Sequence, residues 1–105
     1  MSNNFFPLTA DELVKRINKI PKVKLAMLPT ALEYLPNMSK ELEINLYVKR
    51  DDCTALAFGG NKTRHLEFIM AKAVSGNYDC ILTGAASQSN WCRQTVAAAN
   101  KLNLE

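Results

Sequence analysis

The sequence has 105 residues, of which 48% are hydrophobic and 22% are charged, as is typical of one small globular domain. A net charge of +3 is too mild to indicate nucleic-acid binding, and no apolar run is long enough to span a membrane. Three cysteines without a C-x-x-C pair indicate reduced thiols in a cytoplasmic protein, and the presence of a single histidine argues against a zinc site. The first residues lack the pattern of a signal peptide.

The first half of the chain predicts one helix and one strand. Thr9 and Glu12 form a capping box, and apolar residues continue at helical spacing until Pro21 ends the segment. Residues 22–36 contain two prolines and a brief alternation, which predicts an extended segment leading into a turn. The alternation in "INLYVKR", residues 44–50, predicts a strand.

The second half predicts a helix, a strand and a second helix. Apolar spacing from residue 61 predicts a helix that ends at Gly76, "CILTG" (80–84) predicts a short buried strand, and alanine-rich "NWCRQTVAAANKL" (90–102) predicts a helix. The order strand–helix–strand–helix favours right-handed crossovers in a parallel sheet, an α/β fold. Because two strands do not make a stable parallel sheet, we expect residues 1–105 to be the N-terminal part of a larger protein.

The stretch "AFGGNKTRHLEF", residues 57–68, superficially resembles a phosphate-binding loop. The Walker A motif requires glycine directly before lysine, but Asn61 separates Gly60 from Lys62, and Ala55 stands where the first glycine should be. The G-x-G-x-x-G dinucleotide motif is absent as well. Asn61 is expected to cap the following helix, which places Lys62 in its first turn. A lysine there can serve as a nucleophile toward a carbonyl group or be an ordinary solvated residue.

A second polar segment, "GAASQSNWCRQ" (84–94), connects the predicted strand 80–84 to the next helix. It contains Ser89, Asn90 and Trp91, where hydroxyl and amide groups could hold a carboxylate or a phenolic oxygen. A simple capped loop explains Ser89 and Asn90 equally well. Lys62 follows the strand predicted at 44–50, just as residues 89–91 follow the strand predicted at 80–84. We therefore expect Lys62 and residues 89–91 to lie along the same edge of the sheet.

Together, "LYVKRDDCTALAFGGNKTRHLEF" and "GAASQSNWCRQTVAAANKL" resemble the D-cysteine desulfhydrase and 1-aminocyclopropane-1-carboxylate deaminase family of pyridoxal-phosphate enzymes. "LPTALEYLP" resembles the N-terminal segment of that family. The resemblance implies the tryptophan synthase β-like fold (PLP fold type II), with only its N-terminal strand–helix–strand–helix portion present. It also implies pyridoxal 5'-phosphate as cofactor, a small amino-acid substrate and a homodimer as the full-length protein.

The resemblance carries three residue roles over by position and points to a fourth position, Trp91, as a neighbour of the substrate. Lys62 matches the catalytic lysine that forms the internal aldimine with the cofactor. Ser89 matches a catalytic serine beside the substrate, and Asn90 matches an asparagine that hydrogen-bonds the phenolic oxygen of the cofactor and lies near the substrate. Trp91 departs from the His or Gln usual at this substrate-neighbouring position. The phosphate cradle and the cofactor-stacking tyrosine of the family belong to later sequence, so the 105-residue chain alone is expected to be inactive.

The resemblance leaves three functions open. The first is a lyase that releases sulfide, ammonia and pyruvate from D-cysteine. The second is a deaminase that converts 1-aminocyclopropane-1-carboxylate to 2-oxobutyrate and ammonia. The third is an inactive fragment without catalytic function.

Overall fold

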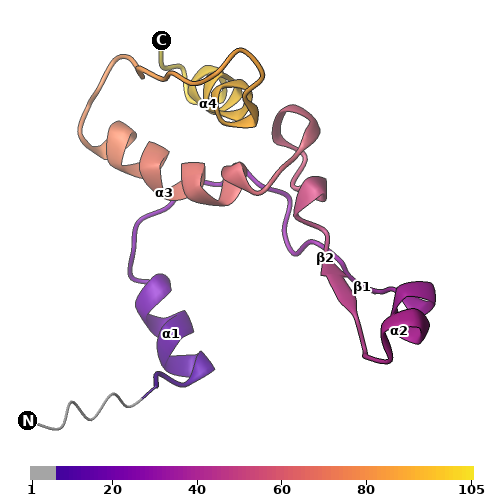
Figure 1. Ribbon diagram of the computed structural model, residues 1–105. Coiled ribbons are helices and arrows are strands. Elements are labelled where there is room, and N and C mark those ends of the chain that lie inside the picture. Colours follow the sequence, from indigo (N-terminus) through magenta and orange to yellow (C-terminus); the bar gives the residue numbers. More distant parts are fainter. Residues whose placement is uncertain (1–6) are drawn as a thin grey trace, which may run out of the picture.

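The computed structural model describes residues 7–105. The expectation of no signal peptide rests partly on residues 1–6, which lie outside the described residues. Figure 1 shows helices α3 and α4 crossing in a central body, with α1 and the β1–α2–β2 unit extending from it in different directions. The elements in chain order are α1 (Ala10–Ile17), β1 (Leu32–Tyr34), α2 (Pro36–Leu42), β2 (Tyr47–Lys49), the short 3-10 helices η1 (Asp51–Cys53) and η2 (Leu56–Phe58), α3 (Lys62–Ser75) and α4 (Asn90–Lys101).

Helix α1 begins with the predicted capping box. The backbone N–H of Glu12 donates to the Thr9 hydroxyl over 3.3 Å, and the Thr9 N–H donates to the Glu12 carboxylate over 2.9 Å. These bonds satisfy amides that have no partner within the helix. The helix ends at Ile17 rather than continuing to Pro21, and backbone bonds of the turn type follow it.

Strands β1 and β2 form a two-stranded antiparallel sheet in which Leu32 pairs with Lys49 and Tyr34 with Tyr47. The strand predicted over residues 44–50 is confirmed for its last part, Tyr47–Lys49. Strand β1 lies in the segment predicted to be extended, and α2, between the two strands, was not predicted. Pro36 in the first turn of α2 is the residue that starts this helix, because its fixed φ suits that position.

Helices α3 and α4 confirm the predicted helices of the second half. Gly76 follows α3 at its C-terminus, as predicted. The core cluster consists of Leu25, Leu66, Met70 and Ala98, which come from the segment before β1 and from both helices. The small alanine side chains of α4 let its backbone approach α3 closely, so the two helices fix each other's position.

The strand predicted at residues 80–84 is wrong, and so is the parallel crossover that depended on it, because this segment is not a strand in the structure. The sheet within residues 7–105 is antiparallel. Two backbone hydrogen bonds nevertheless pair this segment with Glu105 in the parallel pattern. The Glu105 N–H donates to Asp79 O over 2.9 Å, and the Ile81 N–H donates to Glu105 O over 2.6 Å. A single paired residue is too short to define a strand, because a ladder needs several successive bonds.

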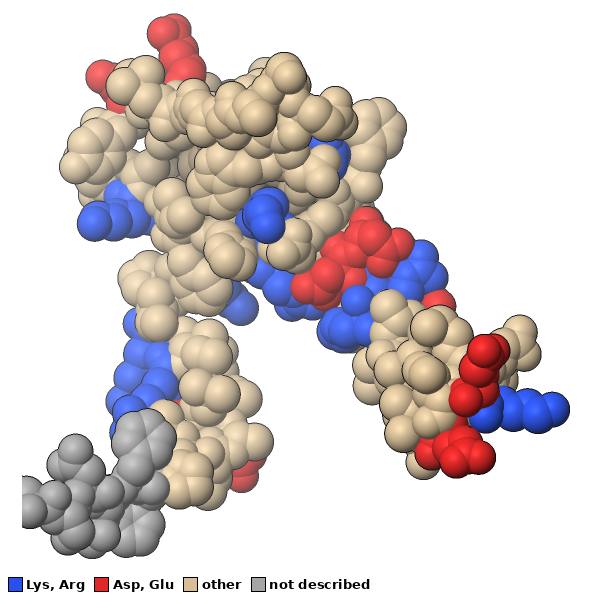
Figure 2. All heavy atoms as spheres, in the orientation of Figure 1, with Lys and Arg blue, Asp and Glu red and all other residues tan. Residues whose placement is uncertain are grey.

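Charged side chains gather where the β1–α2–β2 unit joins the helical body, and Figure 2 shows them as adjoining red and blue surfaces. Arg50 pairs with Glu33 over 2.9 Å and with Asp52 over 2.6 Å. Arg64 of α3 pairs with Asp51 over 2.8 Å. These pairs connect β1, the loop after β2 and the first turn of α3, and they position the loop that leads to Lys62.

Candidate functional site

The two glycines before Lys62 adopt backbone conformations that other residues avoid. Gly59 has φ of 78° and Gly60 has φ of 135°. A Cβ on Gly59 would collide with the backbone carbonyl of Asp52, and a Cβ on Gly60 would collide with the side-chain amide of Gln94. Glycine is therefore required at both positions, for its conformation and for the close approach of neighbouring groups.

Buried hydroxyl groups fix this glycine turn. Thr54 is fully buried, and its Oγ1 donates to Gly60 O over 2.8 Å and accepts from Gly60 N over 2.9 Å. Thr63 is also fully buried, and its Oγ1 donates to Gln94 Oε1 over 2.7 Å. The Thr63–Gln94 bond is buried and the two Thr54–Gly60 bonds are partly buried, so losing a partner would be destabilising and the turn has one preferred position.

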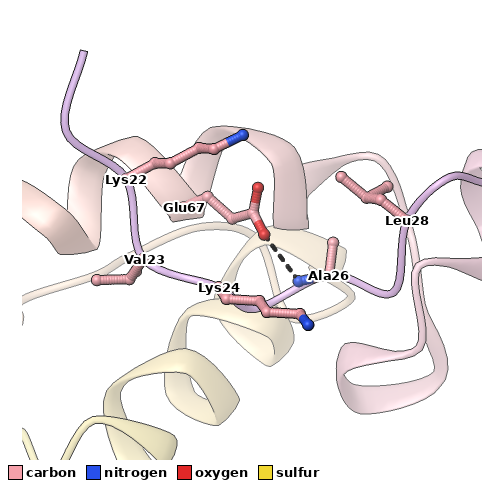
Figure 3. A pocket seen from close by; sticks show the side chains of 6 residues that line it. All are labelled: Lys22, Val23, Lys24, Ala26, Leu28 and Glu67. Carbon is pink, nitrogen blue, oxygen red and sulfur yellow. Dashed lines mark hydrogen bonds between the residues drawn. The ribbon is translucent and has the colours of Figure 1, made fainter. Parts of the chain in front are cut away.

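Two charged residues that follow Lys62 on α3, Arg64 and Glu67, hold neighbouring segments in place. Arg64 makes a bidentate contact with Asp51, with Nε–Oδ2 and Nη2–Oδ1 distances of 2.8 Å each. Glu67 is 5% exposed, and its Oε1 accepts the backbone N–H groups of Leu25 and Ala26, each over 3.0 Å. Figure 3 shows the Glu67 side chain extending from α3 toward Ala26.

The opening drawn in Figure 3 belongs to this structural contact rather than to the candidate site. It is lined by Lys22, Val23, Lys24, Ala26, Leu28 and Glu67. The Glu67 Oε1 atom in it already accepts two backbone N–H groups, so this carboxylate is committed to holding the segment before β1.

Lys62 differs from Arg64 and Glu67 because its side chain has no bonded partner among the described residues. It is the first residue of α3 and is half-buried. Within residues 7–105 its ammonium group takes part in no hydrogen bond or salt bridge, whereas Arg64 and Glu67 are both committed. The expectation that Asn61 caps the helix is wrong, because its side chain makes no capping bond. Its helical φ and ψ explain this, since capping needs an extended residue.

Ser89 and Asn90 begin α4. Ser89 is the N-cap, and its Oγ accepts from Cys92 N over 3.1 Å, which confirms the capped-loop interpretation and leaves the hydroxyl proton for a further acceptor. Asn90 is exposed, and its Oδ1 accepts from Arg93 Nη2 over 3.2 Å. Trp91 is half-buried and packs against the core cluster.

Contacts between helices, not a shared sheet edge, bring the two segments together. Arg93 Nη2 donates to Gly59 O over 3.3 Å as well as to Asn90 Oδ1, so one guanidinium spans from the glycine turn to the start of α4. Thr63 and Gln94 make the second link. The linking role of Gln94 was missed from the sequence. Its spacing of four residues from buried Ala98 is the signal that places it on the inner face of α4.

The groups present suit one side of a pyridoxal-phosphate molecule. A primary amine can attack its aldehyde carbon, and the Asn90 amide nitrogen and the Ser89 hydroxyl supply donors for its phenolic oxygen or for a substrate carboxylate. The described residues hold no group of three or more His, Cys, Asp or Glu that could bind a metal ion. None of the helices between residues 7 and 105 is both long and apolar enough to cross a membrane.

Comparison with known proteins gives a consistent result. Residues 23–105 match the family model described as "Pyridoxal-phosphate dependent enzyme". The chain is 49% identical over 88 residues to "D-cysteine desulfhydrase" of Salmonella paratyphi C, covering 84% of this chain and 27% of that protein. It is 46% identical over 91 residues to "D-cysteine desulfhydrase" of Klebsiella pneumoniae, covering 87% of this chain and 28% of that protein.

A solved structure agrees with these sequence relatives. It is described as an ACC deaminase homologue, and it matches with a TM-score of 0.86 and 39% identity over 92% of this chain and 30% of that chain. The α/β fold is therefore that of the tryptophan synthase β-like enzymes, as the sequence predicted. The chain spans between a quarter and a third of the length of these relatives. With most of its residues matched by the family model, the chain belongs to the family of pyridoxal-phosphate dependent enzymes.

Proposed function

We propose that this chain forms the N-terminal part of a pyridoxal-phosphate dependent lyase that releases sulfide, ammonia and pyruvate from D-cysteine. The single observation that carries the proposal is the state of Lys62. The fold fixes the motif around it through buried threonines and two committed charged residues, yet leaves the lysine amine without a partner among residues 7–105. A reactive amine in a rigid surrounding is what covalent attachment of an aldehyde cofactor requires.

In this proposal Lys62 is the attachment point of the cofactor and moves protons at the substrate. Asn90 donates to the phenolic oxygen through its amide nitrogen, because its oxygen already accepts from Arg93. Ser89 donates its hydroxyl proton to the substrate, since its lone pair accepts from Cys92 N. Trp91 stays a predicted neighbour of the substrate, although the structure records its packing against the core. When bound, pyridoxal phosphate supplies an electron sink for the substrate.

The net reaction balances with water as co-reactant: D-cysteine and water give pyruvate, ammonia and hydrogen sulfide. The choice of D-cysteine is supported by the relatives at 46% and 49% identity, which carry the name D-cysteine desulfhydrase. A homodimer and a cytoplasmic location are part of the same proposal, by analogy with the family.

A second candidate function is deamination of 1-aminocyclopropane-1-carboxylate to 2-oxobutyrate and ammonia. It is supported by the 39% identity to the structure of an ACC deaminase homologue. The departure at Trp91 bears on both substrates, since the position was expected to neighbour them. A third candidate, an inactive fragment, is favoured if cells contain the 105-residue chain as the final product.

The test uses the complete gene product, purified with pyridoxal phosphate, and two lysine variants of the same helix. We expect a visible absorption band and sulfide release from D-cysteine in the wild type. Lys62→Ala abolishes both, and Lys72→Ala, at an exposed lysine near the end of α3, preserves both. Formation of 2-oxobutyrate without sulfide supports the second candidate, and a folded protein that takes up no pyridoxal phosphate contradicts both.

A further inference from the structure

We propose that Arg93 is a positioning residue that sets the orientation of the Asn90 amide relative to the glycine turn before Lys62. The inference rests on the proposed function, because the groups that Arg93 connects are the two halves of the proposed cofactor site. The observation is the pair of bonds from one nitrogen: Nη2 lies 3.3 Å from Gly59 O and 3.2 Å from Asn90 Oδ1.

The Arg93 bond decides which end of the Asn90 side chain is left for a ligand. An asparagine amide has one oxygen acceptor and one nitrogen donor, and the two ends can exchange by rotation about the last bond. A cationic donor fixed on the oxygen side holds the amide in one of these two states. The nitrogen is then the end left to donate, which is the polarity that a phenolic oxygen needs.

The carbonyl of Gly59 fixes the guanidinium itself. Gly59 is buried and its N–H donates to Leu56 O over 3.0 Å, so its backbone is held in place and its carbonyl is a fixed acceptor. The neighbouring residue Gln94 packs against Gly60, the next residue of the turn. Consecutive residues of α4 therefore contact consecutive glycines, and Arg93 makes the polar contact.

The surroundings of Arg93 argue against a purely stabilising role. Its Nη1 atom is buried and has no hydrogen-bond partner among the described residues. A buried N–H group without a partner is destabilising, so this arginine is a poor choice for stability alone. Its planar fork can serve acceptors on two segments, which a single ammonium group does less well.

The test compares Arg93→Met and Arg93→Lys with the wild type, using the complete gene product. Arg16→Met is the control for the loss of one arginine, since Arg16 is exposed in the last turn of α1 and lies outside the glycine turn and α4. The readouts are the dissociation constant of pyridoxal phosphate, the wavelength of its visible absorption maximum when bound, and the urea midpoint of the cofactor-free protein.

We expect both Arg93 variants to weaken pyridoxal-phosphate binding about tenfold, the effect of one lost oriented donor, and to move the absorption maximum. Arg16→Met leaves both quantities unchanged. Arg93→Lys keeps the charge and the aliphatic stem, so it keeps the test valid even if Arg93→Met does not fold.

Two results overturn the inference alone: Arg93 variants that lower the urea midpoint but bind the cofactor with wild-type affinity and spectrum, or a complete rescue by Arg93→Lys. A wild type that takes up no pyridoxal phosphate overturns the proposed function and, with it, the role given to Arg93.

Discussion

Thr63 Oγ1 lies 2.7 Å from Gln94 Oε1, and this bond joins the helix that begins at Lys62 to the helix that begins at Asn90. Both side chains are fully buried. Because the two proposed halves of the site lie on different helices, their relative position depends on buried polar contacts such as this one. The bond therefore serves the geometry of the site as well as the stability of the fold.

We expect Thr63→Val to destabilise the complete gene product by about 1–3 kcal/mol, since it preserves shape but leaves the Gln94 oxygen without its donor. Thr63→Ser keeps the hydroxyl and should lose less. Thr83→Val, at an exposed threonine, is the control. Urea unfolding of the cofactor-free protein measures the difference, and equal stabilities for Thr63→Val and the wild type would contradict the assigned bond.

Gly60→Ala should destabilise the turn for two separate reasons. Its φ of 135° is strained for alanine, and the new Cβ would meet the Gln94 amide. Adding Gln94→Ala to Gly60→Ala removes the collision but not the strain. We therefore expect the double variant to lose less stability than the sum of the losses of the two single variants. Gly84→Ala is the control, because a Cβ there meets nothing within 4 Å. A double-mutant cycle in urea measures the coupling, and strictly additive effects would refute the contact.

Glu67, five residues after Lys62 on α3, tests whether the acidic residue of the stretch 57–68 is structural. Glu67→Ala leaves the N–H groups of Leu25 and Ala26 without their acceptor, at a cost of about 1–3 kcal/mol for each buried donor. Glu67→Gln keeps an oxygen and should lose less. Glu41→Ala, at an exposed position of α2, is the control. The measurement is the free energy of unfolding, and a Glu67→Ala protein as stable as Glu41→Ala would overturn this role.

The sequence predicts the helices of this chain better than its strands, for a physical reason. Helix bonds are local, so the capping box at Thr9 and the C-terminal Gly76 are enough to place α1 and α3. A strand needs a partner along its whole length. Residues 80–84 have the right composition, but Glu105 is the residue that pairs there, and one pair makes no strand.

The candidate site was predictable to a different extent on each helix. The capping role of Ser89 follows from its residue type, whereas the need for glycine at positions 59 and 60 is seen only in the structure, from their positive φ angles and close neighbours. The bonds from Arg93 to Gly59 and from Thr63 to Gln94 cross more than thirty positions of sequence, and only the packing of α3 on α4 reveals them.

The acid side of the pH–stability profile should depend on the pairs that position the loop before Lys62. Hydrogen bonds from Arg64 lower the pKa of Asp51, against the opposing effect of desolvation, and hydrogen bonds from Arg50 lower the pKa of Asp52 to about 2. A carboxyl group with a lowered pKa in the folded state stabilises the protein above its unfolded pKa of about 3.9. That stabilisation is lost as the pH falls from about 4 toward 2, because folded and unfolded states then bind the same protons.

We therefore expect Asp51→Asn to lower stability at pH 7 and to flatten the decline in stability as the pH falls below about 4. Asp11→Asn, at an exposed residue in the first turn of α1, is the control for the loss of one carboxylate. The measurement is the urea midpoint of the cofactor-free protein at a series of pH values. Since Asp51 holds α3 through Arg64, the loop before Lys62 should loosen over the same pH interval. An Asp51→Asn profile parallel to the wild type would show that this pair does not govern the acid response.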